Sequence, residues 1–306
     1  MSYLKETKFL LLVFLAACFP KEEAVEPIPR VNQSVEVDAG EFKNDVVFYS
    51  LDEQKIVAKS SPMAWDFYID EDVIRLNYLR SMRVAEFNDD WYKLEDTAGL
   101  DFRYLTFDMY DGLTQWQLKE NQIYVVDYGM DNDYKPMGLM SVRFERVAEG
   151  IHIWYNAIGS DYEVYEIVTE PSFYYNLREK ATLDLPTEDE YDVAFGKYTD
   201  LVTFGDVTQE YLIYGALQGR SLVYREVAPF DSVLNENFDV IRLSSAKNVI
   251  GWDWKAFNLD KNAYEITENY TYLISSNAGF KYKLRFVSFY NRKGVSGHPT
   301  FEWKLL

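Results

Sequence analysis

Short apolar runs, separated by aspartate, asparagine, glycine and proline, follow one another along the chain from Val35 onward. In most of these runs apolar and polar residues alternate with a period of two, and β-branched and aromatic residues predominate, as half-buried antiparallel strands require. The clearest runs are Val46–Tyr49, Asp101–Phe107, Ile123–Tyr128, Ile151–Tyr155, Tyr211–Tyr214, Tyr282–Phe289 and Thr300–Leu305. The pattern predicts an all-β protein of antiparallel strands, with one short helix expected at Asp231–Val240.

An internal repeat runs through this strand pattern. Residues 48–69 superpose without a gap on residues 174–195, at an offset of 126. The aligned pairs include Tyr49 with Tyr175, Leu51 with Leu177, and Trp65-Asp66 with Tyr191-Asp192. A chance match of aromatic-rich strands is the alternative, but a usual domain size of about 150 residues also suits two domains. We therefore expect two tandem antiparallel β domains, at residues 35–168 and 169–306.

The first residues have the features of a secretory signal. Lys5 and Lys8 precede the nine-residue apolar run FLLLVFLAA, which is too short to span a bilayer, since about 20 residues are needed. The ending Leu15-Ala16-Ala17-Cys18 resembles a bacterial lipobox, in which the cysteine receives a diacylglycerol and becomes the N-terminus. We expect a signal peptide at residues 1–17, lipid attachment at Cys18 and a flexible tether at residues 18–34.

Charge and composition argue against several functions. Asp and Glu number 50 against 31 Lys and Arg, and the net charge of −19 repels nucleic-acid phosphates. Cys18 is the only cysteine, which excludes an intrachain disulfide and a cysteine-rich metal site. The two histidines are His152, on a predicted strand, and His298, in a predicted hairpin connection. Because no nucleophile elbow or phosphate-binding glycine loop occurs either, we expect a protein that is not an enzyme and holds no metal ion of its own.

Stretches in both halves of the chain resemble a known family. The opening VEVDAGEFKNDVVFYSL at Val35–Leu51, followed by Ala64–Phe67 and Val73–Asn77, is similar to the start of HmuY-like lipoproteins of Bacteroidetes. Tyr282–Phe301 is similar to the C-terminal hairpin of the same family. The resemblance implies an all-β domain on a lipid anchor, present here as a tandem copy. It also implies capture of haem at the cell surface and transfer to an outer-membrane haem receptor.

The chain departs from this family at a position that holds haem iron. In the founding member of the family two histidines hold the haem iron, and one of them lies in a segment after a Gly-Trp pair. Here Gly251-Trp252 leads into a segment without histidine. Other relatives use pairs of methionines, and a thioether can ligate haem iron. Bis-histidine ligation is therefore not expected.

Potential soft ligands gather in one segment of the first half. Met130, Met137 and Met140 lie close together in the sequence, and His152 shares a predicted strand face with Trp154. We take Met137, Met140 and His152 as candidate haem ligands. The alternatives are methionines that fill a core and a strand histidine with a structural hydrogen bond.

Together these features predict an outer-membrane lipoprotein, exposed at the cell surface, that binds haem or a similar planar ligand for uptake. Lys21-Glu22-Glu23 resembles the signal that exports lipoproteins to the surface in Bacteroidetes, although a solvated linker has the same composition. One alternative is a surface module that binds protein or glycan and has no haem site. A glycan hydrolase is a third hypothesis.

Overall fold

The computed structural model describes residues 31–40, 43–104, 118–131, 135–160 and 164–306. Regular structure in these ranges consists of strands and short 3₁₀ turns, without an α-helix, so the predicted all-β class is confirmed. The strands are β1 Gln33–Glu36, β2 Val46–Ser50, β3 Lys55–Ser60, β4 Phe67–Ile69, β5 Ile74–Leu76, β6 Arg83–Phe87, β7 Ile123–Asp127, β8 Leu139–Val147, β9 Gly150–Ala157, β10 Val164–Val168, β11 Phe173–Asn176, β12 Ala181–Leu183, β13 Val193–Phe204, β14 Val207–Gln218, β15 Leu222–Val227, β16 Lys255–Asn258, β17 Ala263–Ile266, β18 Tyr270–Ser275, β19 Lys281–Tyr290 and β20 Ser296–Leu305.

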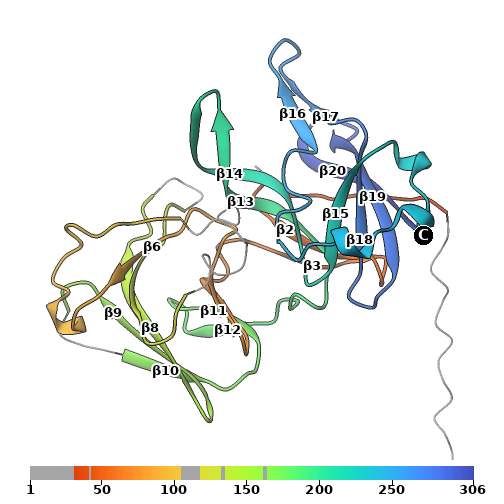
Figure 1. Ribbon diagram of the computed structural model, residues 1–306. Coiled ribbons are helices and arrows are strands. Elements are labelled where there is room, and N and C mark those ends of the chain that lie inside the picture. Colours follow the sequence, from red (N-terminus) through yellow and green to blue (C-terminus); the bar gives the residue numbers. More distant parts are fainter. Residues whose placement is uncertain (1–30, 41–42, 105–117, 132–134, 161–163) are drawn as a thin grey trace, which may run out of the picture.

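The sheets form two lobes (Figure 1). Lobe A contains the sheets β10-β9-β8-β7-β6 and β12-β11-β4-β5. Lobe B contains the sheets β1-β20-β19-β18-β15 and β14-β13-β2-β3, and the β16–β17 hairpin projects from it. Strands that correspond in the two sequence repeats thus take corresponding positions in the four-stranded sheets of the two lobes.

Strand β2 joins the cores of the two lobes. All five of its residues are buried, because its two faces belong to different apolar clusters. Val46 and Phe48 pack into the cluster that fills lobe A, whereas Val47 and Tyr49 pack into the cluster of lobe B. The alternation of side chains along one strand therefore ties the lobes together.

The repeat appears in the structure as a pair of reciprocal contacts. The Leu51 N–H donates to Asp192 Oδ2 at 2.7 Å, and the Leu177 N–H donates to Asp66 Oδ2 at 2.8 Å. The backbone repeats this exchange, since the N–H groups of Asp192 and Asp66 donate to the carbonyls of Tyr49 and Tyr175, respectively. Each bond differs from its counterpart by 126 in both residue numbers, and each joins one repeat to the other.

The lobes do not follow the expected boundary between residues 168 and 169. Strand β1 pairs with β20, β2 with β13, and β4 with β11, so strands from the two halves share sheets. Lobe B takes β1, β2 and β3 from the first half, and lobe A is inserted between β3 and β13. The physical reason is the strand exchange just described: residue 168 separates sequence repeats and not sheets.

Three local expectations also differ from the structure. Asp231–Val240 contains 3₁₀ turns, within η3 Phe230–Ser232, η4 Asn235–Asn237 and η5 Val240–Arg242, in place of a helix. His298 lies in β20, whose bulged pairing with β19 shortens the predicted connection. Only a bridge between Val84 and Arg103 forms in residues 101–104, and residues 105–107 lie outside the described ranges.

The expected lipoprotein segment is largely beyond the described part of the chain. Cys18, the signal peptide and residues 18–30 of the expected tether are not included in it, while β1 already begins at Gln33. Among the residues that the structure covers, none forms a helix with the length and hydropathy needed to cross a bilayer.

Candidate functional site

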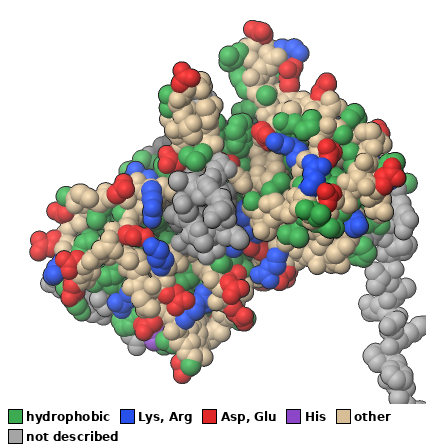
Figure 2. Space-filling model, in the orientation of Figure 1, with side chains coloured by type: hydrophobic (Ala, Val, Ile, Leu, Met, Phe, Trp, Pro, Cys, Tyr) green, Lys and Arg blue, Asp and Glu red, His purple; other side chains and the backbone are tan. Residues whose placement is uncertain are grey.

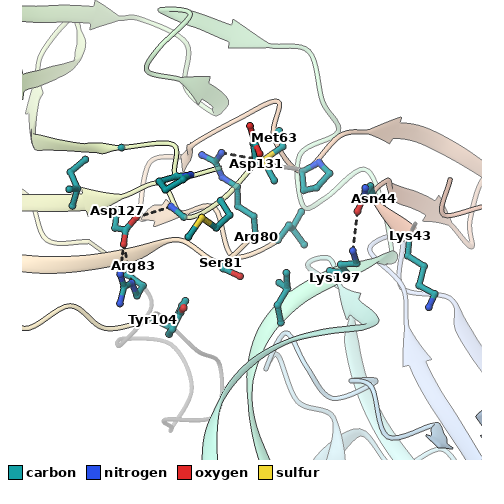
Figure 3. A pocket seen from close by; sticks show the side chains of 18 residues that line it. Lys43, Asn44, Met63, Arg80, Ser81, Arg83, Tyr104, Asp127, Asp131 and Lys197 are labelled. Atoms are coloured by element: carbon teal, nitrogen blue, oxygen red, sulfur yellow. Dashed lines mark hydrogen bonds and ion pairs between the residues drawn. The ribbon is translucent and has the colours of Figure 1, made fainter. Parts of the chain in front are cut away.

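A cavity of about 960 Å³ lies between the two lobes (Figure 3). Its volume is at the upper end of the range of about 300 to 1,000 Å³ found for small-molecule sites. Lobe A contributes the segments that follow β3, β5 and β7, and lobe B contributes the segment before β2 and the facing parts of β13 and β14. The lining includes Lys43, Asn44, Met63, Arg80, Arg83, Tyr104, Asp127, Met130, Asp131, Lys197 and Leu212.

Arg80 provides a fixed charge on the lobe A side of this cavity. Its side chain is only 2% exposed and forms an ion pair with Asp66, which is itself buried. The guanidinium also lies against the ring of Tyr128, with Cζ 5.5 Å from the ring centroid. Burial raises the pKa of Asp66 and lowers that of Arg80, while the attraction between the two charges opposes both shifts. Because Asp66 is held by Leu177 of the other repeat, the repeat contact positions Arg80.

Two thioethers meet at the Arg80 guanidinium. Arg80 Nη1 lies 3.6 Å from Met63 Sδ and 3.7 Å from Met137 Sδ. Met63 lines the cavity, and Met130, whose exposed fraction is 51%, lies at its surface. Sequence reasoning missed Met63, although it directly precedes the Ala64–Phe67 segment that carries the family resemblance.

The three ligands predicted from the sequence do not lie together. Met137 is half-buried beside the cavity through its contact with Arg80. Met140, on β8, packs against the core of lobe A and is absent from the cavity lining. His152, on β9, also lies away from the lining; its Nδ1 is 3.8 Å from Glu145 Oε2 and its ring packs edge-on near Trp154. None of the three is part of the cavity lining itself: Met137 packs against the core of lobe A as Met140 does, but its neighbours Pro136 and Gly138 line the cavity and its sulfur contacts Arg80.

Cationic side chains line much of the remaining wall. Lys197 Nζ donates to Asn44 Oδ1 at 3.0 Å, and burial lowers the pKa of Lys197 and of Lys43. Arg83 is paired with Asp127 and lies against the rings of Phe102 and Tyr104. The lining contains four cationic and two acidic side chains, in a chain of net charge −19 whose acidic groups are spread over the surface seen in Figure 2. The cavity therefore favours anionic groups.

The fold and this cavity define a two-lobed, all-β protein with an internal site of ligand size. Within that class, the chain belongs to the HmuY protein family, whose family description matches residues 43–303. The family resemblance predicted from the sequence is thus confirmed. No curated protein matches the chain.

Three solved structures align along most of the chain. Apo PinO from Porphyromonas gingivitis has 9% identity and a TM-score of 0.31, with 90% of this chain and 97% of that chain covered. The apo HmuY analogue of Tannerella forsythia has 11% identity and a TM-score of 0.28, with 90% and 95% covered. An HmuY-like heme binding protein from Bacteroides vulgatus has 11% identity and a TM-score of 0.24, with 89% and 91% covered. At such TM-scores the family match alone carries the assignment.

Proposed function

We propose that this protein binds haem, or a similar planar anionic tetrapyrrole, in the cavity between its lobes, and that it does so for uptake without catalysing a reaction. The observation that carries the proposal is the meeting of thioethers and cations in one cavity of an acidic chain. The family to which the chain belongs points the same way.

The thioethers suit haem iron in its reduced state. Methionine sulfur is a soft ligand that stabilises ferrous relative to ferric iron. Arg80, whose charge is balanced by Asp66, would hold the sulfur atoms of Met63 and Met137 side by side. We therefore propose Met63 and Met137 as the candidate iron ligands and expect affinity to rise on reduction.

The cations on the lobe B wall suit the carboxylates of the same ligand. Lys43 and Lys197 lie in the lining without a salt bridge to a described carboxylate within 4 Å, and Lys197 is oriented by Asn44. Haem carries two propionates, and Lys43 and Lys197 would be the side chains that hold these carboxylates at lobe B. An anion there would also relieve the repulsion that Lys43 exerts on Lys197.

The proposal includes the cellular setting expected from the sequence. We propose lipid attachment at Cys18, exposure at the surface of the outer membrane, and an outer-membrane haem receptor as partner. Replacing Cys18→Ala should release the protein from membranes washed with high salt, because the acidic chain lacks the positive charge that would hold it to anionic lipid. Full retention of this variant in the membrane fraction would refute the lipid anchor.

Titration of haem into the protein without residues 1–18 tests the binding proposal. Ferric and dithionite-reduced haem are added, and the Soret band reports binding and iron ligation. We expect the double variant Met63→Ala/Met137→Ala to lose the ligation spectrum. The double variant Lys43→Ala/Lys197→Ala should keep the spectrum but bind about tenfold more weakly, a change of about 1.4 kcal/mol. Met140→Ala is the matched control for the methionines and His152→Ala for the histidine, and both should bind as the wild type does.

Two results would overturn the assignment. Loss of ligation in His152→Ala, with the methionine variants unaffected, would exclude the thioethers as ligands. An unchanged Soret band on adding haem to the wild type, in both redox states, would refute haem binding and favour an interaction module.

A further inference from the structure

Strands β13 and β14 extend far beyond the sheet that anchors them. β2 pairs only with residues Val193–Phe195 of β13, whereas β13 and β14 pair without a register shift as far as Phe204 and Val207. The distal part of this pair is a two-stranded ribbon that projects from lobe B, and the β16–β17 hairpin projects beside it (Figure 1). β14 is the outermost strand of its sheet.

The hydrogen-bonding direction along β14 is fixed at its base. Ala216 exchanges two backbone bonds with Gly251, at 2.9 and 3.0 Å, on the side away from β13. Because N–H and C=O groups alternate between the two sides of a regular strand, Thr208, Glu210 and Leu212 also direct theirs away from β13. Within the described chain, these outward groups have no hydrogen-bond partner in the backbone. β14 therefore presents an open strand edge several residues long.

Strand β16 presents a second open edge. The Thr267 N–H donates to the Trp254 carbonyl at 2.9 Å, so the backbone of Phe257, three residues after Trp254, faces away from β17. The two hairpins meet at their base, where Lys255 Nζ donates to the Tyr214 carbonyl at 2.5 Å. Beyond this point, no backbone bond joins β14 to β16 in the part of the chain described.

Apolar and acidic side chains accompany these edges. Tyr211 and Phe257 have exposed fractions of 48% and 46%, and Leu259, just beyond β16, is 85% exposed. Phe257 packs edge-on against Tyr264 at 5.1 Å, and Lys255 Nζ lies 5.8 Å from the ring centroids of both Tyr264 and Tyr214, so the two hairpins adjoin in one patch. Acidic side chains cap both hairpins (Figure 2), and the exposed Lys261 is already paired with Glu265.

We propose that the β14 edge, flanked by the β16–β17 hairpin, is a docking site for an extended segment of a partner protein with alternating apolar and basic side chains. Such a segment would add to β14 as a strand, with its backbone bonded to Thr208, Glu210 and Leu212. Its apolar side chains would pack on Tyr211 and Phe257, and its basic side chains would meet the acidic hairpin ends.

Charge argues for a basic partner over a second copy of this chain. Asp206, Glu210 and Asp260 lie on the two hairpins, so edge-to-edge pairing of two copies would bring like charges together. A basic segment removes this repulsion. Leu212 also lines the cavity between the lobes, so the added strand would lie at the cavity rim; the inference itself does not depend on haem binding.

Amide exchange measured by NMR on the protein without residues 1–18 tests the proposal. In the free protein, the amides of Thr208, Glu210 and Leu212 should exchange quickly, whereas those of Gln209 and Ile213, which face β13, should exchange slowly. The probe is a capped seven-residue peptide that alternates valine and lysine. It should slow exchange of the outward amides by about tenfold or more at saturation. The matched control peptide carries N-methyl groups on the bonds that would face β14 and should have no effect.

A pair of variants separates backbone pairing from side-chain packing. Leu212→Pro removes one outward N–H and should abolish protection by the peptide, whereas Leu212→Ala keeps the N–H and should retain it. Uniform exchange rates along β14 in the free protein, or equal binding of a valine–glutamate peptide, would overturn the proposal. A dimer in sedimentation, with the outward amides protected before peptide is added, would assign the edge to a second copy and refute a partner protein.

Discussion

Asp66 and Asp192 occupy equivalent positions in the two repeats, yet we expect their replacement by asparagine to change stability in opposite directions. Both side chains are buried, and each accepts a backbone N–H from the other repeat. Asp66 is paired with the buried Arg80, whereas no salt bridge to Asp192 occurs among the described residues. Asparagine keeps the shape and one acceptor oxygen, so the exchange isolates the effect of the charge.

The magnitudes follow from burial and pairing. Burial, and then the charge of Asp52, raise the pKa of Asp192 to about 6, about two units above the unfolded value. Ionising Asp192 in the folded protein therefore costs about 3 kcal/mol at pH 7.5, and only about 1 kcal/mol at pH 4.5. Because the pKa of Asp192 is raised in the folded protein, the folded state is most stable relative to the unfolded state at low pH, where Asp192 is protonated. This contribution to the free energy of unfolding is lost as the pH rises toward 6. Asp66→Asn instead leaves Arg80 without its counter-charge, which costs about 3 to 5 kcal/mol.

Urea unfolding followed by tryptophan fluorescence, at pH 4.5 and pH 7.5, measures both effects. Asp192→Asn should be more stable than the wild type by about 1 to 3 kcal/mol at pH 7.5, after allowing for a weaker bond to Leu51, and this advantage should shrink at pH 4.5. Asp66→Asn should be destabilised by about 3 kcal/mol or more at pH 7.5. Equal destabilisation by the two substitutions, or an Asp192→Asn effect that does not change with pH, would refute the reasoning.

Three further predictions concern the stability of the fold. A fragment of residues 169–306 should not unfold cooperatively in a thermal melt followed by circular dichroism, because in it β13 lacks β2 and β20 lacks β1. A fragment of residues 61–189 keeps both sheets of lobe A and should retain a β spectrum. A cooperative melt of residues 169–306 would contradict this prediction. Burial, then the charge of Lys43, lower the pKa of Lys255 to about 7, so loss of its proton should raise the stability of the wild type by about 3 to 4 kcal/mol between pH 7 and pH 10, and Lys255→Met should lack this part of the rise in urea titrations. A Cβ on Gly215 would lie 2.5 Å from the Gly251 carbonyl oxygen, so Gly215→Ala should lower stability by about 1 to 3 kcal/mol in the same assay. An unchanged urea midpoint would show that β14 and the segment at Gly251 can separate without cost.

The strands were predictable from the sequence, but their exchange between lobes was not. Alternation marks β9 and β20 because each places apolar side chains on one core, whereas β2 is a continuous apolar run because both of its faces are buried. The offset of 126 identifies Asp66 and Asp192 as equivalent, yet equivalence is the same whether each carboxylate bonds its own repeat or the other one. Only tertiary packing decides between these arrangements, and here it selects the crossed one.

The candidate site was predictable only where sequence neighbours provide it. Met137 was found because methionines cluster in its segment; it packs against the core of lobe A as Met140 does, but its sulfur also contacts Arg80. Met63, Lys43 and Lys197 come from three separate segments, and the pairing of β2 with β13 brings them to one cavity. A sequence pattern does not predict that these residues line the same cavity, because the segments that contribute them are far apart in the chain.

A sequence difference between the two repeats explains why the cavity forms beside the first repeat and not at the equivalent position of the second. The offset of 126 places Pro62-Met63 of the first repeat opposite Glu188-Asp189 of the second. Glu188 is buried in ion pairs with Arg75 and Lys247, the latter at 2.7 Å, and these long side chains occupy the space at that position. At the first position Pro62 and Met63 carry no charge and line the cavity beside Arg80, whose charge is already balanced by Asp66. Equivalent positions in the two repeats therefore hold a buried ion cluster in one case and line a cavity in the other. We expect substitutions at Met63 to change ligand binding and substitutions at Glu188 to change the free energy of unfolding.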